Sequence, residues 1–96
     1  MTRRKFRQTK QFRRDYAKMK RSGRKISKLH AVIDLLMDGK PLPLKYHDHE
    51  LQGAWKGVRD CHIGGDWLLL YELSRGADGN EIVTFHATDT HENLFG

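Results

Sequence analysis

Two stretches in the first forty residues repeat apolar side chains at the spacing of an α-helix. The first series consists of Phe12, Tyr16 and Met19, and the second consists of Ile26, Leu29, Ile33 and Leu36. The first predicts a helix over about Gln8 to Arg21 with one buried face and one basic face, and Ser22-Gly23 ends it. The second predicts a helix that ends near Asp38-Gly39. Two such helices joined by a tight turn are expected to form a hairpin.

After residue 55 the pattern changes to the alternation typical of β-strands. The predicted strands are Lys56 to Ile63, Trp67 to Leu73 and Ile82 to His86, with turns at Gly64-Gly65 and Gly76 to Asn80. In the first strand, Arg59, Cys61 and Ile63 are expected on one face, and Val58, Asp60 and His62 on the other. Residues Arg4 to Phe6 are compatible with an edge strand, although their pattern favours it only weakly.

Hairpin strands that follow a helical pair predict an α+β fold. We expect the two N-terminal helices to form a hairpin packed on one face of a small antiparallel β-sheet, with the other face open. The 96 residues show no internal repeat, low-complexity linker or second pattern of elements, so residues 1–96 are expected to form a single domain.

Charge divides the chain into two unlike parts. Residues 1–28 hold thirteen Lys or Arg and one acidic residue, a net charge of +12, whereas the remaining residues hold five basic and eleven acidic residues, a net charge of −6. The basic part favours a polyanionic partner, with nucleic acid first and an acidic protein second, over a helix face that is merely solvated. The sequence has one cysteine and no apolar run of membrane-spanning length, which favours the reducing cytoplasm and no membrane.

Five of the six histidines lie between residues 47 and 91. Histidine exchanges protons near neutral pH, so a group of imidazoles suits the acid–base cleavage of RNA, which needs a base, an acid and positive charge on the phosphate. A metal site is the alternative, because His47 and His49 are spaced as ligands on a strand and other His or Asp residues could complete it. Structural zinc sites usually recruit thiolates, and Cys61 alternates with His62. We therefore expect no metal and no cofactor.

Several motifs in this order resemble a known family, the YafQ branch of the RelE/ParE superfamily of toxin-antitoxin systems. They are Leu42-Pro43-Leu44, Asp48-His49-Glu50-Leu51-Gln52-Gly53, Trp55-Lys56-Gly57-Val58-Arg59-Asp60-Cys61-His62, Asp66-Trp67 and Thr90-His91-Glu92-Asn93-Leu94-Phe95-Gly96. The resemblance implies a RelE/ParE-like fold and a ribosome-dependent endoribonuclease that cleaves translated mRNA. It also implies contact with ribosomal RNA and inhibition by a cognate acidic antitoxin.

The same resemblance implies which residues act. The catalytic candidates are His49, His62, Asp66 and His91, and the candidates for binding substrate are Trp67, Phe95, Lys56 and Arg59. We expect Asp66 or His49 to be the base, His91 the acid, and His62 with a nearby Lys or Arg to stabilise the phosphate. Trp67 and Phe95 each have a packing alternative, since Trp67 precedes three leucines and Phe95 is expected to pack back on the sheet beside His91.

One position departs from the family pattern. Relatives commonly carry arginine four residues before the last histidine, where this chain has Ala87. Lys56, Arg59 or a residue of the basic N-terminal segment is expected to supply the missing positive charge. Two alternatives remain open at the level of sequence: a ParE-like toxin that inhibits gyrase without cutting RNA, and a catalytically inactive relative that only binds RNA or an antitoxin.

Overall fold

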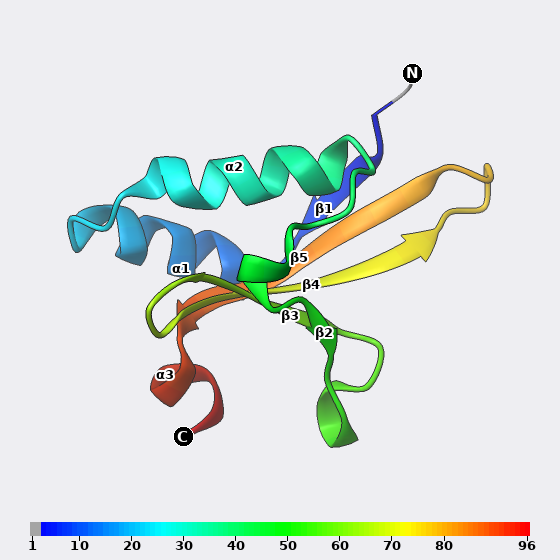
Figure 1. Cartoon of the computed structure of the whole chain (residues 1–96). Helices are drawn as coiled ribbons and strands as arrows, with labels where there is room; N and C mark the ends of the chain where they lie inside the picture. Colours follow the sequence, from blue (N-terminus) through cyan, green and yellow to red (C-terminus); the bar gives the residue numbers. More distant parts are fainter. Residues whose placement is uncertain (1–2) are drawn as a thin grey trace.

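The computed structural model describes residues 3–96. Its elements, in chain order, are β1 (Lys5–Gln8), α1 (Lys10–Arg21), α2 (Ile26–Met37), the 3-10 helix η1 (Leu44–Tyr46), β2 (His49–Glu50), the 3-10 helix η2 (Gly53–Trp55), β3 (Arg59–Gly64), β4 (Trp67–Arg75), β5 (Glu81–Thr90) and α3 (His91–Phe95). Helices α1 and α2 lie side by side on one face of the sheet, while α3 and the β2–η2 segment project from its other side (Figure 1). The predicted α+β class with a helical hairpin on one face is confirmed.

The sheet has the strand order β1-β5-β4-β3-β2. Strands β3 to β5 pair antiparallel, as predicted. The short β2, which was not predicted, also pairs antiparallel with β3, but β1 pairs in parallel with β5. The expectation of a purely antiparallel sheet is therefore corrected at this edge. The reason is topological, because α1 and α2 carry the chain from β1 to the far edge of the sheet, and successive hairpins then bring β5 back beside β1.

Local interactions move several predicted boundaries. Gln8 belongs to β1, and α1 begins at Lys10 because Thr9 caps it, with Thr9 Oγ1 accepting the Phe12 N–H at 3.0 Å. Strand β3 begins at Arg59 rather than Lys56, because the chain turns through Gly57 at a φ of 93°. Strands β4 and β5 are longer than predicted. Strand β4 continues to Arg75 in an exposed hairpin, and β5 continues to Thr90 because residues 87–90 pair with residues 67–70 of β4.

Most of the core lies between the helices and the sheet. It contains Phe12, Met19, Leu29, Val32, Leu36, Met37, Cys61, Ile63, Trp67, Leu69, Tyr71, Val83 and Phe85. The predicted alternation of β3 is confirmed, because Cys61 and Ile63 point into this core whereas Val58 belongs to a smaller cluster on the opposite face. Within residues 3–96 no helix combines the length and the apolar character needed to cross a bilayer.

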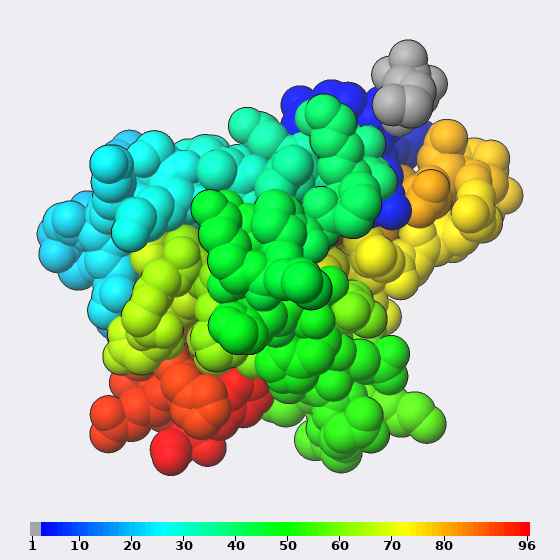
Figure 2. Space-filling view, in the orientation of Figure 1, coloured from blue at the N-terminus to red at the C-terminus, as the bar shows by residue number. Residues whose placement is uncertain are grey.

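The face of the sheet away from the helices is only partly open. Val58, Leu70 and Ala87 are buried there, and side chains from α3 and from the loop around η2 pack against them. In Figure 2 the C-terminal segment lies at the lower edge of the molecule, away from α1 and α2, and the green segment that contains η1, β2 and η2 runs from beside α2 down to that edge. We call the side of the sheet away from α1 and α2 the open face, and it carries the histidines described next.

Candidate functional site

Three imidazoles gather beside β3 on the open face. His62 points to this face because it alternates with Cys61 and Ile63, which face the core. The ring of His47 lies 5.4 Å from the ring of His62, and the ring of His49 lies 6.5 Å from it, centre to centre. Two histidines before β3 and one within it therefore form a single cluster, although His47 and His49 precede His62 by fifteen and thirteen positions in the chain.

The loop that presents His47 and His49 is held by Asp48. The Asp48 carboxylate accepts two hydrogen bonds from the Arg59 guanidinium, at 3.2 and 3.1 Å, and one from the Tyr71 hydroxyl at 2.5 Å. His47 adopts a left-handed backbone conformation, with φ of 50°, which turns the chain so that its two histidines flank this anchor. The bond to Asp48 raises the pKa of Arg59, and burial followed by the bond to Asp48 raises the pKa of Tyr71.

Arg59 is consequently placed away from the histidines. It shares the core-facing side of β3 with Cys61, while His62 faces the other way, and its guanidinium is paired with Asp48. We expected Arg59 to be one of the cations that stabilise the phosphate. In this structure the alternation of the strand and the ion pair with Asp48 hold its guanidinium on the core-facing side of β3, next to the His47–His49 loop.

Asp60 lies beneath the histidines and was missed as a site residue in the sequence. Its side chain is almost fully buried, and its Oδ2 is 3.7 Å from His49 Nε2. Burial raises the pKa of Asp60, whereas the positive charges of His49, His62 and His91 each lower that pKa. These three imidazoles are therefore close enough to act on one carboxylate. The signal in the sequence was the alternation that puts Asp60 and His62 on one face.

His91 reaches the cluster from the end of β5. The Thr90 side chain caps α3 by accepting the Asn93 N–H at 3.2 Å, and the backbone N–H of His91 donates to the Asp66 carbonyl at 2.9 Å. The ring of Phe95 lies 5.2 Å from the ring of His91, and Phe95 also packs on the small cluster of the open face. The terminal aromatic thus packs back on the sheet beside His91.

Asp66 and Trp67 are positioned differently from the histidines. The Asp66 carboxylate is 64% exposed in the β3–β4 turn and lies 4.0 Å from the Arg24 guanidinium. The contact of Asp66 with His91 is made by the backbone, through the Asp66 carbonyl oxygen. Trp67 is only 3% exposed, and its indole N–H donates to Thr88 Oγ1 at 2.8 Å in the core. This burial matches the packing alternative and leaves little indole surface on which a base could stack.

Ala87 forms part of the floor of the site. It is fully buried with Val58 and Leu70, and no positive charge stands at this position. Lys56, one of the proposed substitutes, is exposed at the end of η2.

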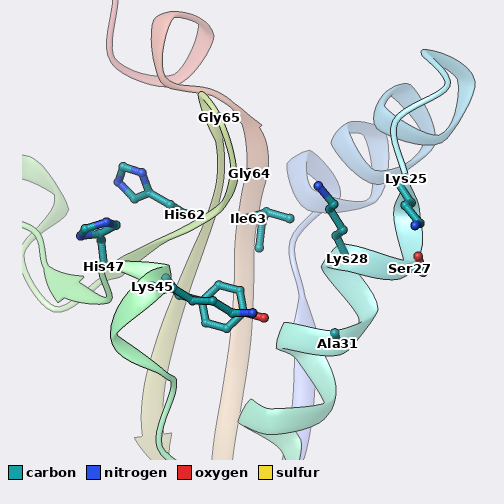
Figure 3. Close-up of a pocket in the computed structure, with 11 residues that line it drawn as sticks. Lys25, Ser27, Lys28, Ala31, Lys45, His47, His62, Ile63, Gly64 and Gly65 are labelled. Atoms are coloured by element: carbon teal, nitrogen blue, oxygen red, sulfur yellow. The ribbon is translucent and has the colours of Figure 1, made fainter.

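Other cations line a groove of about 580 Å³ that His62 also lines, between the N-terminal half of α2, η1 and the end of β3. Lys25 and Lys28 line it from the helix side, and Lys45 and His47 from the η1 side, with His62 at one wall (Figure 3). The groove leads away from the histidine cluster. Its lysines make it positively charged, which suits the phosphates of an extended nucleic-acid strand.

The remaining histidines are engaged elsewhere. His86 Nε2 lies 2.9 Å from Glu72 Oε1, and His30 Nε2 lies 2.6 Å from the Tyr16 hydroxyl on the helix side. Among residues 3–96, no group of three or more His, Cys, Asp or Glu side chains is arranged as ligands of one metal ion.

Comparison with known proteins identifies the family. Residues 4–96 match the model of YafQ, a bacterial toxin of type II toxin-antitoxin systems. The chain belongs to the YafQ toxin family. It is 38% identical over 87 residues to the mRNA interferase toxin YafQ of Escherichia coli strain K12, which covers 90% of this chain and 89% of that relative.

Solved structures agree with this assignment. The E. coli DinJ-YafQ toxin-antitoxin complex contains a chain that is 36% identical and superposes with a TM-score of 0.86, covering 97% of this chain and 98% of that one. A YoeB/ParE toxin from Agrobacterium tumefaciens, 18% identical, shares the fold with a TM-score of 0.75 over 91% of this chain and 98% of its own. The expected RelE/ParE-like fold and the resemblance to YafQ toxins are both confirmed.

Proposed function

We propose that this YafQ-family toxin is an endoribonuclease that cleaves mRNA on the translating ribosome. The observation that supports this most strongly is the arrangement of His49, His62 and His91 around one buried carboxylate on an accessible face of the sheet. The relatives named as mRNA interferases support the same substrate class. A ribosome-bound target also favours the cytoplasm as the place of action.

The reaction follows from the positions of the proton-exchanging groups. A base removes the proton of the 2′-hydroxyl, the 2′-oxygen attacks the adjacent phosphorus, and an acid protonates the departing 5′-oxygen, which leaves a 2′,3′-cyclic phosphate or its 3′-phosphate product. We assign the base to His49 in preference to Asp66, because the Asp66 carboxylate is paired with Arg24 at the tip of the turn. His91 serves as the acid, and the reaction uses no metal.

Positive charge on the phosphate oxygens is the remaining requirement. Because position 87 is a buried alanine, we assign this positive charge to His62 and to the lysines of the adjoining groove, Lys28 and Lys45. The groove would hold the phosphates that flank the cleaved bond. Phe95, beside His91, offers a partly exposed ring for a nucleotide of the message.

We propose two macromolecular partners for this chain. The basic face of α1 presents Lys10, Arg13, Arg14, Lys18 and Arg21 along one groove, which suits the backbone of ribosomal RNA. The ribosome would then supply the orientation of the message that a small protein does not provide alone. A relative has been solved in a complex with its antitoxin, and we propose that an acidic antitoxin also binds this chain.

The test is cleavage of a message on purified ribosomes. The wild-type protein is expected to cut ribosome-bound mRNA, and His91→Ala is expected to lose about 10²-fold or more in rate while remaining folded, because the leaving oxygen lacks its acid. His30→Ala is the matched control, since His30 lies on the helix side with Tyr16, and it should cleave normally.

Other outcomes distinguish the alternatives. DNA breaks without mRNA cleavage in cells that express the chain would identify a ParE-like gyrase inhibitor. An absence of both effects would identify an inactive relative, as the alanine at position 87 allows. Equal cleavage of free RNA and ribosome-bound mRNA would contradict the dependence on the ribosome.

A further inference from the structure

The Asp60 carboxylate is the least satisfied polar group near the site. The residue is 3% exposed, and its Oδ1 accepts no hydrogen bond from any residue in the described part of the chain. Buried carboxylates are normally paired or hydrogen-bonded, because an unsatisfied charge in the interior is costly. An orphaned carboxylate oxygen in this position indicates a requirement other than stability.

Among the described residues, its Oδ2 has one ion-pair partner, the Nε2 atom of His49, at 3.7 Å. The other ring nitrogen of His49, Nδ1, lies 2.7 Å from the His47 carbonyl oxygen. A carbonyl oxygen only accepts hydrogen bonds, so Nδ1 must carry a proton. Nε2 is therefore the atom that gains and loses a proton, and it does so directly opposite the Asp60 carboxylate.

The other charged groups around Asp60 are few. His62 follows it by two residues on β3, His91 approaches from α3, and Asp48 lies in the loop that precedes β2. Across the sheet, β4 contributes Leu70 opposite Asp60, and β5 contributes the alanine at position 87 opposite Leu70. The positive charges that lower the pKa of Asp60 most are the imidazoles of His49, His62 and His91.

We propose that Asp60 is a positioning residue for RNA cleavage, which orients His49 and stabilises the imidazolium that forms when His49 Nε2 takes the 2′-hydroxyl proton. The inference rests on the proposed function. In this step the 2′-O–H bond breaks and an Nε2–H bond forms. The 2′-oxygen bonds to phosphorus, and the P–O5′ bond breaks as the 5′-oxygen takes a proton from His91. The free Oδ1 remains for a second imidazole of the cluster, His62 or His91.

This role separates the effects of Asp60 on activity and on stability. Neutralising a carboxylate that has a structural role reduces the stability of the protein but leaves the cleavage rate of the folded molecules unchanged. A carboxylate retained for the chemistry has the opposite property, because its burial opposes folding. Neutralising Asp60 should thus slow cleavage without making the protein less stable.

The experiment compares Asp60→Asn with Asp15→Asn, a matched neutralisation of a buried carboxylate that lies on the helix side. Single-turnover cleavage of mRNA on purified ribosomes is measured over a range of ribosome concentrations, together with the melting temperature. For Asp60→Asn we expect a fall in maximal rate of about 10- to 100-fold, unchanged half-saturation and an equal or higher melting temperature. For Asp15→Asn we expect an unchanged maximal rate per folded molecule.

An unchanged rate in Asp60→Asn, or a loss of rate that matches a loss of folded protein, would overturn the proposal.

A second measurement does not depend on activity. The pKa of Asp60, followed by its carboxyl ¹³C signal, should rise in His49→Gln, because the positive charge of His49 lowers it in the wild type. An unchanged Asp60 titration would also overturn the proposal. Wild-type protein that fails to cleave mRNA would instead refute the proposed function, while the titration still decides whether the two residues are coupled.

Discussion

The two faces of the sheet treat their buried carboxylates in opposite ways. On the helix side, Asp15 Oδ2 accepts the backbone N–H of Thr88 at 3.1 Å and so ties α1 to β5. On the open face, Asp60 has one oxygen without a partner and the other facing an imidazole. Burial raises the pKa of both residues, but only Asp15 gains a backbone hydrogen bond that lowers its pKa again.

The difference shows how a small domain divides its tasks. The helix side buries a continuous apolar core, which supplies most of the stability through the removal of apolar surface from water. The open face has only a small apolar cluster around Leu70, so its polar side chains are available to contact one another and a ligand. Substitutions on the first face should change the free energy of unfolding, and substitutions on the second should change the rate of cleavage.

The largest expected effect on stability is that of Leu69→Ala. Leu69 is fully buried in the middle of β4, and its truncation leaves a cavity between the sheet and the helices. We expect the free energy of unfolding to fall by about 2–5 kcal/mol in urea denaturation, with unchanged cleavage per folded molecule. Leu44→Ala is the control, because Leu44 is 94% exposed and should change stability by less than about 0.5 kcal/mol. A loss of activity greater than the loss of folded protein would contradict this division of tasks.

Asp15→Ala is expected to have the next largest effect. It leaves the Thr88 N–H buried without an acceptor, which costs about 1–3 kcal/mol in the free energy of unfolding. Asp15→Asn keeps an acceptor oxygen and removes only the charge, so it should cost less. Thermal or urea unfolding of the two variants measures the difference. Equal stability of Asp15→Ala and the wild type would show that the helix side does not depend on this bond.

Sequence periodicity was sufficient to predict both long helices, the order of β3 to β5 and the face on which His62 lies. The parallel pairing of β1 was not predictable, because β1 has four residues, all exposed, and therefore shows no alternation of buried and polar positions. Gln8 illustrates the limit, since its propensity allows a helix but its pairing opposite Phe85 places it in a strand.

The candidate site was predictable in part, for a similar reason. His49, His62 and His91 were found from their chemistry and from family motifs, and the structure places all three near Asp60. The face of Asp60 was predicted, but its burial was not, because burial depends on contacts from segments far away in the chain. The engagement of Arg59 by Asp48 likewise needs the fold of the loop and the position of Tyr71.

Tyr71→Phe tests the contact between the two faces. Tyr71 is buried in the helix-side core, yet its hydroxyl donates to Asp48 in the loop that carries His47 and His49. Removal of the hydroxyl is expected to reduce stability by about 0.5–1.5 kcal/mol, because Arg59 still donates to Asp48. Cleavage should fall a few-fold as the loop is held less firmly. Urea denaturation and single-turnover cleavage measure both effects, and unchanged amide exchange across residues 47–49 would contradict the anchoring role.

The smallest expected effect is a dependence of stability on pH that differs between Asp60→Asn and the wild type. The pKa of Asp60 in the folded protein is raised by burial above its usual value of 3.8, so the folded state holds this proton more tightly than the unfolded chain does. The stability contributed by this proton is fully present below pH 3.8 and is lost as the pH rises through the folded-state pKa. Asp60→Asn has no such loss. Relative to the wild type, its free energy of unfolding should therefore increase over this window, by a difference on the order of 0.5 kcal/mol.

Urea denaturation of both proteins between pH 3.5 and about 7 measures that difference. Asp89 contributes the opposite dependence: burial raises its pKa, but bonds from Asn93, Lys18 and Thr90 outweigh this and lower it, so its stabilisation is lost in acid. Because Asp89 is present in both proteins, its contribution cancels in the comparison. In a His49→Gln background the difference should be larger, since the imidazolium that lowers the pKa of Asp60 is absent. A constant difference across the pH range in both backgrounds would show that the charge of the buried Asp60 carboxylate does not affect stability.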